Sequence, residues 1–294
     1  MRLTLQRVVW WLFLVSVLLL GAEIVGHLLG RPLRDLPLFN GLIHVWAVLL
    51  LAFHAWVMLG AVRAAGFVGL AMAVGFVAEV VSLHHSTLFG AHYRYHGGGP
   101  KWMGLPLAVP VFWALFIYLG YAMSSLLVVA LRGEKPSRAG GGANWIPALA
   151  AVDGLIVVSI DVMLDPLMVH AGAWSWWNVG RAVHGIPLGN FLGWFLIAAF
   201  CSGVFRTVEY VRPARHRPVG LGMYLMPALH YAMLWGVLVS WAHRVALGQV
   251  AAAGTAMMGP ILVVWLVVFA RYRGARVQAT VTAEPVVVPL RGDQ

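Results

Sequence analysis

Five of the ten acidic residues in the chain lie inside, or at the ends of, segments that otherwise contain mostly apolar side chains. These residues are Glu23, Glu79, Asp153, Asp161 and Asp165. A carboxylate near the middle of a membrane helix costs about 2.5–3.5 kcal/mol in insertion experiments. Ionisable residues in membrane segments therefore usually face an interior polar site that handles protons or ions, and we expect such a site here.

Two pairs of polar residues have helical spacing. Asp161 and Asp165 are four residues apart, so on a helix they share one face. Because Asp165 precedes Pro166, which favours the end of the helix there, a turn or capping role is the alternative to a functional one. Glu23 and His27 are also four residues apart, and we expect them to form a hydrogen-bonded pair.

The composition around these residues is that of an integral membrane protein with little or no soluble domain. Of the 294 residues, 61% are hydrophobic and 10% are charged, whereas a soluble domain carries about 25% charged residues. The net charge of +10 does not indicate nucleic-acid binding, because the basic residues fall between apolar segments, where membrane topology explains them. The single cysteine, Cys201, excludes an internal disulfide.

Eight apolar segments are long enough to cross a hydrocarbon core, which takes about 20 helical residues. They cover approximately residues 8–29, 39–62, 64–83, 107–131, 145–164, 189–208, 220–243 and 254–272. The sequence therefore predicts an all-α integral membrane protein in which residues 1–272 form one polytopic domain. Residues 273–294 are predicted to be a disordered cytoplasmic tail.

The distribution of basic residues predicts the orientation of the helices. With both termini in the cytoplasm, fourteen Lys and Arg residues lie on the cytoplasmic side and six on the other. This bias predicts a multi-pass protein of the cell membrane with both termini cytoplasmic. The loops 84–106 and 165–188 then lie on the same outer face. Four acidic residues from three predicted helices are expected to converge near that face: Glu23, Glu79, Asp161 and Asp165.

Two segments share a pattern of acidic residue, long aromatic loop, Gly-x-Pro and a Trp nine residues after the Gly. The corresponding residues are Glu79, Gly104, Pro106 and Trp113 in the first copy, and Asp161, Gly185, Pro187 and Trp194 in the second. Both copies have the same membrane orientation, which indicates a parallel internal repeat of helix-loop-helix units. The alternative is that Gly-x-Pro simply begins many membrane helices, because Pro suits the first helical turn.

Histidines in the first loop include a pattern that is found in membrane di-iron oxidoreductases. The loop carries His84, His85, His92 and His96, of which the last two form an H-x-x-x-H box. Membrane di-iron enzymes need several such boxes, and the second loop offers only His170 and His184. A di-iron oxidoreductase is therefore one alternative, and a haem protein is another, with candidate ligands in the spans at His44, His54, His230 and His243. A proton- or cation-coupled transporter is a third alternative. The cytoplasmic half is poor in acids apart from Asp153, which we expect to be structural, and this disfavours the transporter.

A longer pattern joins these residues. It consists of Glu79, Phe89-Gly90-x-x-Tyr93-x-Tyr95, Gly99-Pro100, Gly104-x-Pro106, Pro110 and Trp113, followed by Asp161-x-x-x-Asp165-Pro166, Gly172-x-Trp174-x-Trp176 and Gly185-x-Pro187-x-x-Asn190-Phe191-x-Gly193-Trp194. This pattern resembles the membrane carotenoid biosynthesis family, whose characterised members are carotenoid 1,2-hydratases, including bisanhydrobacterioruberin hydratase. The chain departs from it at Leu88, usually Pro, and at Val183-His184, usually two Tyr.

The resemblance implies a cofactor-independent hydro-lyase that adds water to the terminal C1=C2 double bond of an acyclic ψ end. The carotenoid would be of the lycopene, γ-carotene or bisanhydrobacterioruberin type. Such chemistry needs a protonated acid at neutral pH, and burial or a neighbouring carboxylate raises the pKa of a carboxyl group. The acid protonates C2, aromatic faces stabilise the cation at C1, and water attacks while a carboxylate accepts its proton.

The candidate roles follow from this chemistry and from the positions that match the family pattern. We expect Asp161 or Glu79 to be the acid, and the other, with Asp165, to orient the water. The expected substrate-binding residues are Phe89, Tyr93, Tyr95, Trp102, Trp174, Trp176, Asn190 and Trp194. The expected partners are a lipid-soluble carotenoid, the membrane and other carotenoid enzymes, with no metal, organic cofactor or nucleic acid. Prenyl transfer would need Asp-rich metal-binding loops, which the sequence lacks.

Overall fold

Helices make up most of the computed structural model, which describes residues 2–85, 88–97, 99–132, 143–213, 219 and 221–281. The eight long helices of this described part are α1 (Arg2–Leu28), α2 (Pro37–Leu59), α3 (Ala61–His85), α4 (Ala108–Arg132), α5 (Ile146–His170), α6 (Leu188–Val211), α7 (Leu221–Arg244) and α8 (Gly248–Val281). Each is long and apolar enough to cross a membrane. The prediction of an all-α membrane protein with about eight spans is confirmed.

Two helices extend beyond their predicted ends. The expected end of a helix at Asp165-Pro166 is wrong, because α5 continues through Pro166 to His170. A proline removes one backbone hydrogen bond from a helix, and packing of α5 against α4, α6 and α8 holds the helix on both sides of it. α8 is helical up to Val281, inside the segment 273–294 that was predicted as a tail, and residues 282–294 lie outside the described residues.

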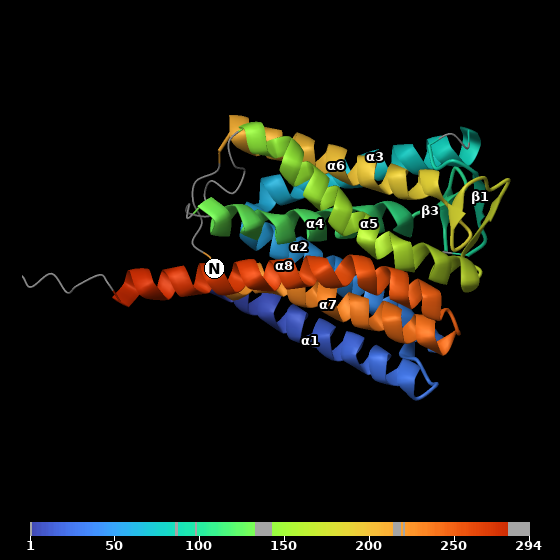
Figure 1. Cartoon of the computed structure of the whole chain (residues 1–294), viewed down its shortest axis with the longest axis horizontal. Coiled ribbons are helices and arrows are strands. Elements are labelled where there is room, and N and C mark those ends of the chain that lie inside the picture. Colours follow the sequence, from blue (N-terminus) through green and yellow to red (C-terminus); the bar gives the residue numbers. More distant parts are fainter. Residues whose placement is uncertain are drawn as a thin grey trace, which may run out of the picture.

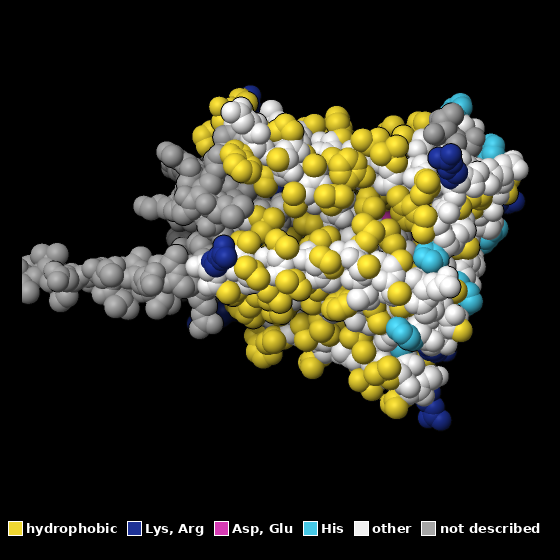
Figure 2. Space-filling model, viewed as in Figure 1, with side chains coloured by type: hydrophobic (Ala, Val, Ile, Leu, Met, Phe, Trp, Pro, Cys, Tyr) yellow, Lys and Arg dark blue, Asp and Glu magenta, His cyan; other side chains and the backbone are white. Residues whose placement is uncertain are grey.

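The helices pack as two neighbouring groups (Figure 1). One group contains α3, α4, α5 and α6, and the other contains α1, α2, α7 and α8, with α4 and α5 packed against α8. One core gathers around Phe67 and Trp113 and a second around Tyr231 and Trp265. Apolar side chains cover the middle of the face in Figure 2, whereas Lys, Arg and His side chains gather towards its ends, as a lipid-facing surface requires.

Short strands close one end of the bundle. β1 (His92–Tyr95) pairs antiparallel with β4 (Trp174–Trp177) although the two strands lie in different loops. Two hairpins follow, formed by β2 (Lys101–Trp102) with β3 (Leu105–Pro106), and by β5 (Ala182–Val183) with β6 (Ile186–Pro187). In Figure 1 this strand layer lies at the end opposite the N-terminus.

The two predicted repeat copies contain the same elements in the same order. The first runs α3–β1–β2–β3–α4 and the second α5–β4–β5–β6–α6. Their hairpins turn in the same way, with positive φ at Met103 and Gly104 in one and at His184 and Gly185 in the other. Two consecutive positive φ angles match a type I′ turn. The antiparallel pairing of β1 with β4 places the two copies side by side, as expected for a parallel repeat.

Candidate active site

Glu79 lies six residues before the end of α3 and is 3% exposed. Tyr93 and Tyr95 in β1 donate their hydroxyl groups to Glu79 Oε2 at 2.6 and 3.0 Å. The indole Nε1 of Trp113 in α4 donates to the other oxygen, Oε1, at 3.0 Å. Both carboxyl oxygens of Glu79 are therefore occupied by side-chain donors.

The two tyrosines stay protonated at neutral pH. Burial, and then the neighbouring Glu79 carboxyl group, raise the pKa of the Tyr93 and Tyr95 phenols well above the usual value. A neutral phenol keeps its O–H, so both residues remain hydrogen-bond donors to Glu79. They are also next to each other, with ring centroids 5.6 Å apart.

A second pair of carboxyl groups lies on α5. Asp161 and Asp165 are 0% and 2% exposed. The amide nitrogen of Asn190 in α6 donates to Asp161 Oδ2 at 2.8 Å and to Asp165 Oδ2 at 2.6 Å. Trp174 in β4 donates its indole N–H to Asp165 Oδ1 at 2.5 Å. Asn190 thus bridges the two carboxyl groups, and Trp174 ties one of them to the strand layer.

Strand pairing brings the two halves together. Tyr95 lies opposite Trp174 across the β1–β4 ladder, with ring centroids 5.5 Å apart, and Tyr93 lies opposite Trp176 at 4.6 Å. Since Tyr95 binds Glu79 and Trp174 binds Asp165, these acidic residues are neighbours through two aromatic rings. We call the resulting set the carboxylate cluster: Glu79, Asp161 and Asp165, with Tyr93, Tyr95, Trp113, Trp174 and Asn190.

Three buried polar atoms of this region have no hydrogen-bond partner among the described residues: Asp161 Oδ1, Ser82 Oγ and Trp176 Nε1. Ser82 and Trp176 both lie beside Tyr93, and Trp176 also lies near Asp165 without forming a normal hydrogen bond to it. A buried polar group without a partner is costly, so such groups usually face water or a ligand. The cluster therefore has the polar atoms needed to receive a small molecule such as water.

The remaining predicted substrate-binding residues differ in their positions. Phe89 is buried, and its ring fills the space beside Gly193, which has no side chain. Trp194 packs on Trp113 with ring centroids 4.3 Å apart, and so supports a residue that binds Glu79. Trp102 is 61% exposed and stacks on Phe76 instead of contacting the cluster.

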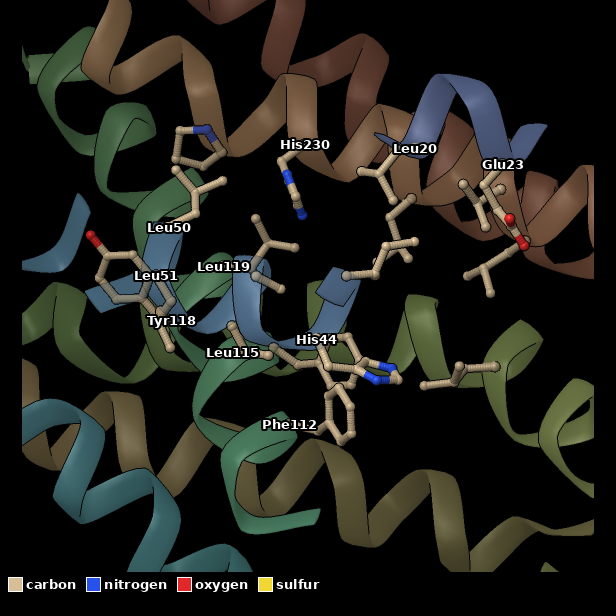
Figure 3. Close-up of a pocket in the computed structure, with 18 of the residues that line it drawn as sticks. Leu20, Glu23, His44, Leu50, Leu51, Phe112, Leu115, Tyr118, Leu119 and His230 are labelled. Carbon is tan, nitrogen blue, oxygen red and sulfur yellow. The ribbon is translucent and has the colours of Figure 1, made fainter. Parts of the chain in front are cut away.

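Glu23 does not join the other acidic residues, so the expected convergence of four acids is wrong. Its carboxyl Oε1 lies 3.1 Å from His27 Nε2 in α1, which confirms the predicted pair. The physical reason is the packing of α1, which lies against α2 and α7, whereas the cluster is built from α3, α4, α5, α6 and the strands. Glu23 instead lines a cavity on the other side of α4 and α5 (Figure 3).

The loop histidines have individual contacts. His96 Nε2 lies 2.8 Å from Ser175 Oγ, and the His92 ring stacks on Trp177 at 5.8 Å. His84 Nδ1 lies 2.8 Å from the Val80 carbonyl oxygen one helical turn earlier. Within the described part of the chain, no three His, Cys, Asp or Glu side chains are grouped as metal ligands.

Two residues of the region were absent from the predicted site. Ser82 lies three residues after Glu79, so helical spacing alone places both on one face. Trp113 was recognised in the repeat and in the family pattern, but its hydrogen bond to Glu79 depends on how α3 and α4 pack. Helical spacing was a usable signal for Ser82, whereas only the three-dimensional structure shows the role of Trp113.

The sequence profile described as carotenoid biosynthesis protein matches residues 39–262. The chain belongs to the carotenoid biosynthesis protein family. No curated protein and no solved structure matches it. All residues of the carboxylate cluster lie inside the part that matches the family, whereas α1, which ends at Leu28, lies outside it. Family membership supports a role in carotenoid biosynthesis within the membrane.

Proposed function

We propose that the protein is a carotenoid hydratase that adds water to the terminal C1=C2 double bond of an acyclic carotenoid end. The observation that carries this proposal is the meeting of three buried carboxyl groups in one cluster, in a membrane protein of the carotenoid biosynthesis family. Hydrogen bonds hold each carboxyl group, and the ring contact between Tyr95 and Trp174 joins Glu79 to the aspartates. Hydration of an unactivated alkene requires a proton donor, a stabilised cation and a positioned water. The cluster offers candidates for each of these requirements.

Asp161 is the best candidate for the proton donor. Among the three acidic residues of the cluster, only Asp161 has a buried carboxyl oxygen, Oδ1, without a hydrogen-bond partner in the described part of the chain. Both oxygens of Glu79 and both oxygens of Asp165 already accept hydrogen bonds. A group that transfers a proton must come within hydrogen-bond reach of the reacting atom, and Oδ1 is the oxygen that is free to do so.

The reaction then follows in two steps. Asp161 protonates C2, which leaves a tertiary cation at C1 and a carboxylate on Asp161. Tyr93, Tyr95, Trp174 and Trp176 supply aromatic faces for the cation, and the Glu79 carboxyl group lies beside the two tyrosines. Water held by unpartnered polar atoms attacks C1 and loses one proton to the Asp161 carboxylate left by the first step, which returns Asp161 to its acid form. One water is consumed and one tertiary alcohol is formed.

The test is expression in a host that makes lycopene, followed by chromatography and mass spectrometry of the pigments. The wild type is expected to form a product heavier by one water. Asp161→Asn and Glu79→Gln keep the shape of the side chain but remove the carboxylic acid, so each is expected to lower the yield by at least about 100-fold, the lower range for acid–base catalysis.

The matched control is Asp35→Asn, which makes the same change in an exposed residue that pairs with Arg244 at 3.5 Å. Yields are divided by the amount of protein in the membrane, so that poor insertion is not mistaken for lost chemistry. Wild-type yields in both Asp161→Asn and Glu79→Gln would contradict the assignment of these residues.

A further inference from the structure

The proposed reaction leaves unused a cavity lined by Glu23. It has a volume of about 450 Å³, which lies in the usual range for small-molecule sites, and it is enclosed by α1, α2, α4, α5 and α7. Its wall is mostly apolar, with several aromatic rings: Phe13, Phe112, Phe116, Tyr118 and Trp241. Figure 3 shows the side chains of Leu20, Leu115, Leu119 and His230 pointing towards one space between the helices.

This cavity is elongated along the helices. On α1 its lining extends from Phe13 to Glu23, ten residues that rise about 15 Å along the helix axis. That is about half the thickness of a hydrocarbon core. Two of its lining residues, His44 and Ala171, are exposed, so the cavity reaches the protein surface at that end. An extended apolar chain fits this shape better than a compact ligand.

The cavity and the carboxylate cluster share two helices as a common wall. On α4, Phe112 faces the cavity while its neighbour Trp113 binds Glu79. On α5, Leu164 faces the cavity while the next residue, Asp165, belongs to the cluster. The open end of the cavity, at Ala171, lies three residues before Trp174 of the cluster.

We propose that this cavity holds the far part of the carotenoid substrate, a conjugated polyene chain, while the end to be hydrated reaches the carboxylate cluster. The inference rests on the proposed function for the identity of the ligand. A flat conjugated chain stacks well on aromatic rings, and the lining combines five of them with aliphatic side chains. Polar side chains also border the chain, among them Glu23, His44 and His230.

α1 forms part of this binding site although it lies outside the segment that matches the family. It contributes Phe13, Leu20 and Glu23 to the lining, and the match begins at residue 39. The hydrogen bond between Trp46 Nε1 of α2 and the Leu12 carbonyl oxygen, at 2.8 Å, fixes α1 against α2. The wall that α1 supplies is therefore a feature of this chain beyond the matched family segment.

The test measures how much polyene remains bound to the protein after purification in detergent from a lycopene-producing host. Ala47→Phe fills the cavity from α2, and Leu20→Trp fills it from α1. Each is expected to lower the retained pigment per protein by at least about tenfold, because overpacking a bound chain costs more than 1.4 kcal/mol. Val48→Phe and Leu18→Trp, at lipid-exposed neighbours that are 36% and 71% exposed, are the matched controls and should retain wild-type amounts.

Retention of wild-type amounts of pigment by Ala47→Phe and Leu20→Trp would overturn the proposal, as would a wild type that retains none. The proposal would also be overturned if phospholipid co-purified with the wild type and both filling variants lost this phospholipid but kept the pigment. The two proposals fail separately. If the wild type forms hydrated product but the filling variants retain as much pigment as the wild type, only the cavity proposal is wrong. If the wild type retains pigment that the filling variants lose, but forms no hydrated product, only the hydratase proposal is wrong.

Discussion

At the scale of single residues, the buried carboxyl groups divide according to their partners. Asp153 is fully buried between α5 and α6, where its Oδ2 accepts from Arg206 Nη2 at 2.8 Å and from the Ser202 hydroxyl. The same guanidinium donates to Ser124 at 2.6 Å and lies 4.5 Å from the centre of the Tyr121 ring. A cation therefore balances the charge of Asp153, and the expectation that it is structural agrees with these contacts.

Asp161 lies on the same helix, but among the described residues its charged neighbours are the carboxyl groups of Asp165 and Glu79 and not a cation. Its partner is the neutral amide of Asn190. Within the described residues, Asp161 and Asp153 each have one carboxyl oxygen without a hydrogen bond, so the charge of the partner is what distinguishes them. A buried charge needs a paired cation or it reverts to the neutral form. The partners of the two residues therefore differ in charge: Asp153 is paired with a cation, whereas Asp161 accepts from a neutral amide.

The Asp153–Arg206 pair gives a prediction about stability. Arg206→Met leaves a buried carboxylate without its cation and is expected to lower the free energy of unfolding by about 3–5 kcal/mol. The double variant Asp153→Leu/Arg206→Met removes both charges and should be less destabilised than Arg206→Met alone. Thermal unfolding in detergent compares the variants, and product per folded protein in the double variant should stay near that of the wild type.

Equal stability of Arg206→Met and the wild type would show that this pair contributes little to the fold. If the double variant is as unstable as Arg206→Met, the loss of stability comes from packing and not from an unpaired charge. The double variant has two neutral side chains and therefore carries no penalty for an unpaired charge.

At the scale of elements, the packing of α3 on α4 decides whether Trp113 can reach Glu79. Gly75 lies one helical turn before Glu79, and a Cβ at this position would lie 2.5 Å from Trp113 Cγ. A real Cβ cannot approach another atom so closely, so the absence of a side chain at Gly75 makes room for the indole. The residue thus positions a side chain of the cluster without touching the carboxyl groups.

Because of this close contact, replacing glycine by alanine is expected to have opposite effects on stability at two positions of α3. Gly75→Ala forces Trp113 to move and is expected to lower stability by about 1–3 kcal/mol and to reduce product yield. Gly69→Ala on the same helix meets nothing within 4 Å, so it should raise stability by about 0.5–1 kcal/mol, because Ala is a better helix former than Gly. Melting temperature and product yield are measured for both variants. A Gly75→Ala protein as stable and active as Gly69→Ala would contradict the role of this contact.

The elements also show what the sequence could and could not predict. The length of the apolar segments was enough to predict eight helices, and the recurrence of Gly-x-Pro and Trp was enough to predict the repeat. Both signals are local patterns in the sequence. The pairing of β1 with β4 was missed because it joins residues such as Tyr95 and Trp174, far apart in the chain. The helix through Pro166 was missed because a local preference was overridden by packing. Glu23 was misplaced because its depth along α1 does not say which helices surround α1.

At the scale of the whole molecule, the strand layer lies at one end of the bundle, and the beginning of α1 and the end of α8 lie towards the other (Figure 1). The carboxyl groups of the cluster lie next to the strand layer, from which Tyr93 and Tyr95 donate hydrogen bonds to Glu79 and Trp174 donates one to Asp165.

This arrangement gives a prediction for the orientation of the whole protein. An even number of spans puts both termini on the same side, and fourteen of the twenty basic residues fall on that side, which predicts that it is the cytoplasm. Green fluorescent protein fused after Gln294 should fluoresce, and alkaline phosphatase fused there should be inactive, because phosphatase folds only after export. Both reporters inserted after Asn178, in the turn between β4 and β5, should give the reverse result. Active phosphatase at Gln294 together with fluorescence at Asn178 would show that the orientation is opposite to the predicted one. The carboxylate cluster would then lie near the cytoplasmic face of the membrane.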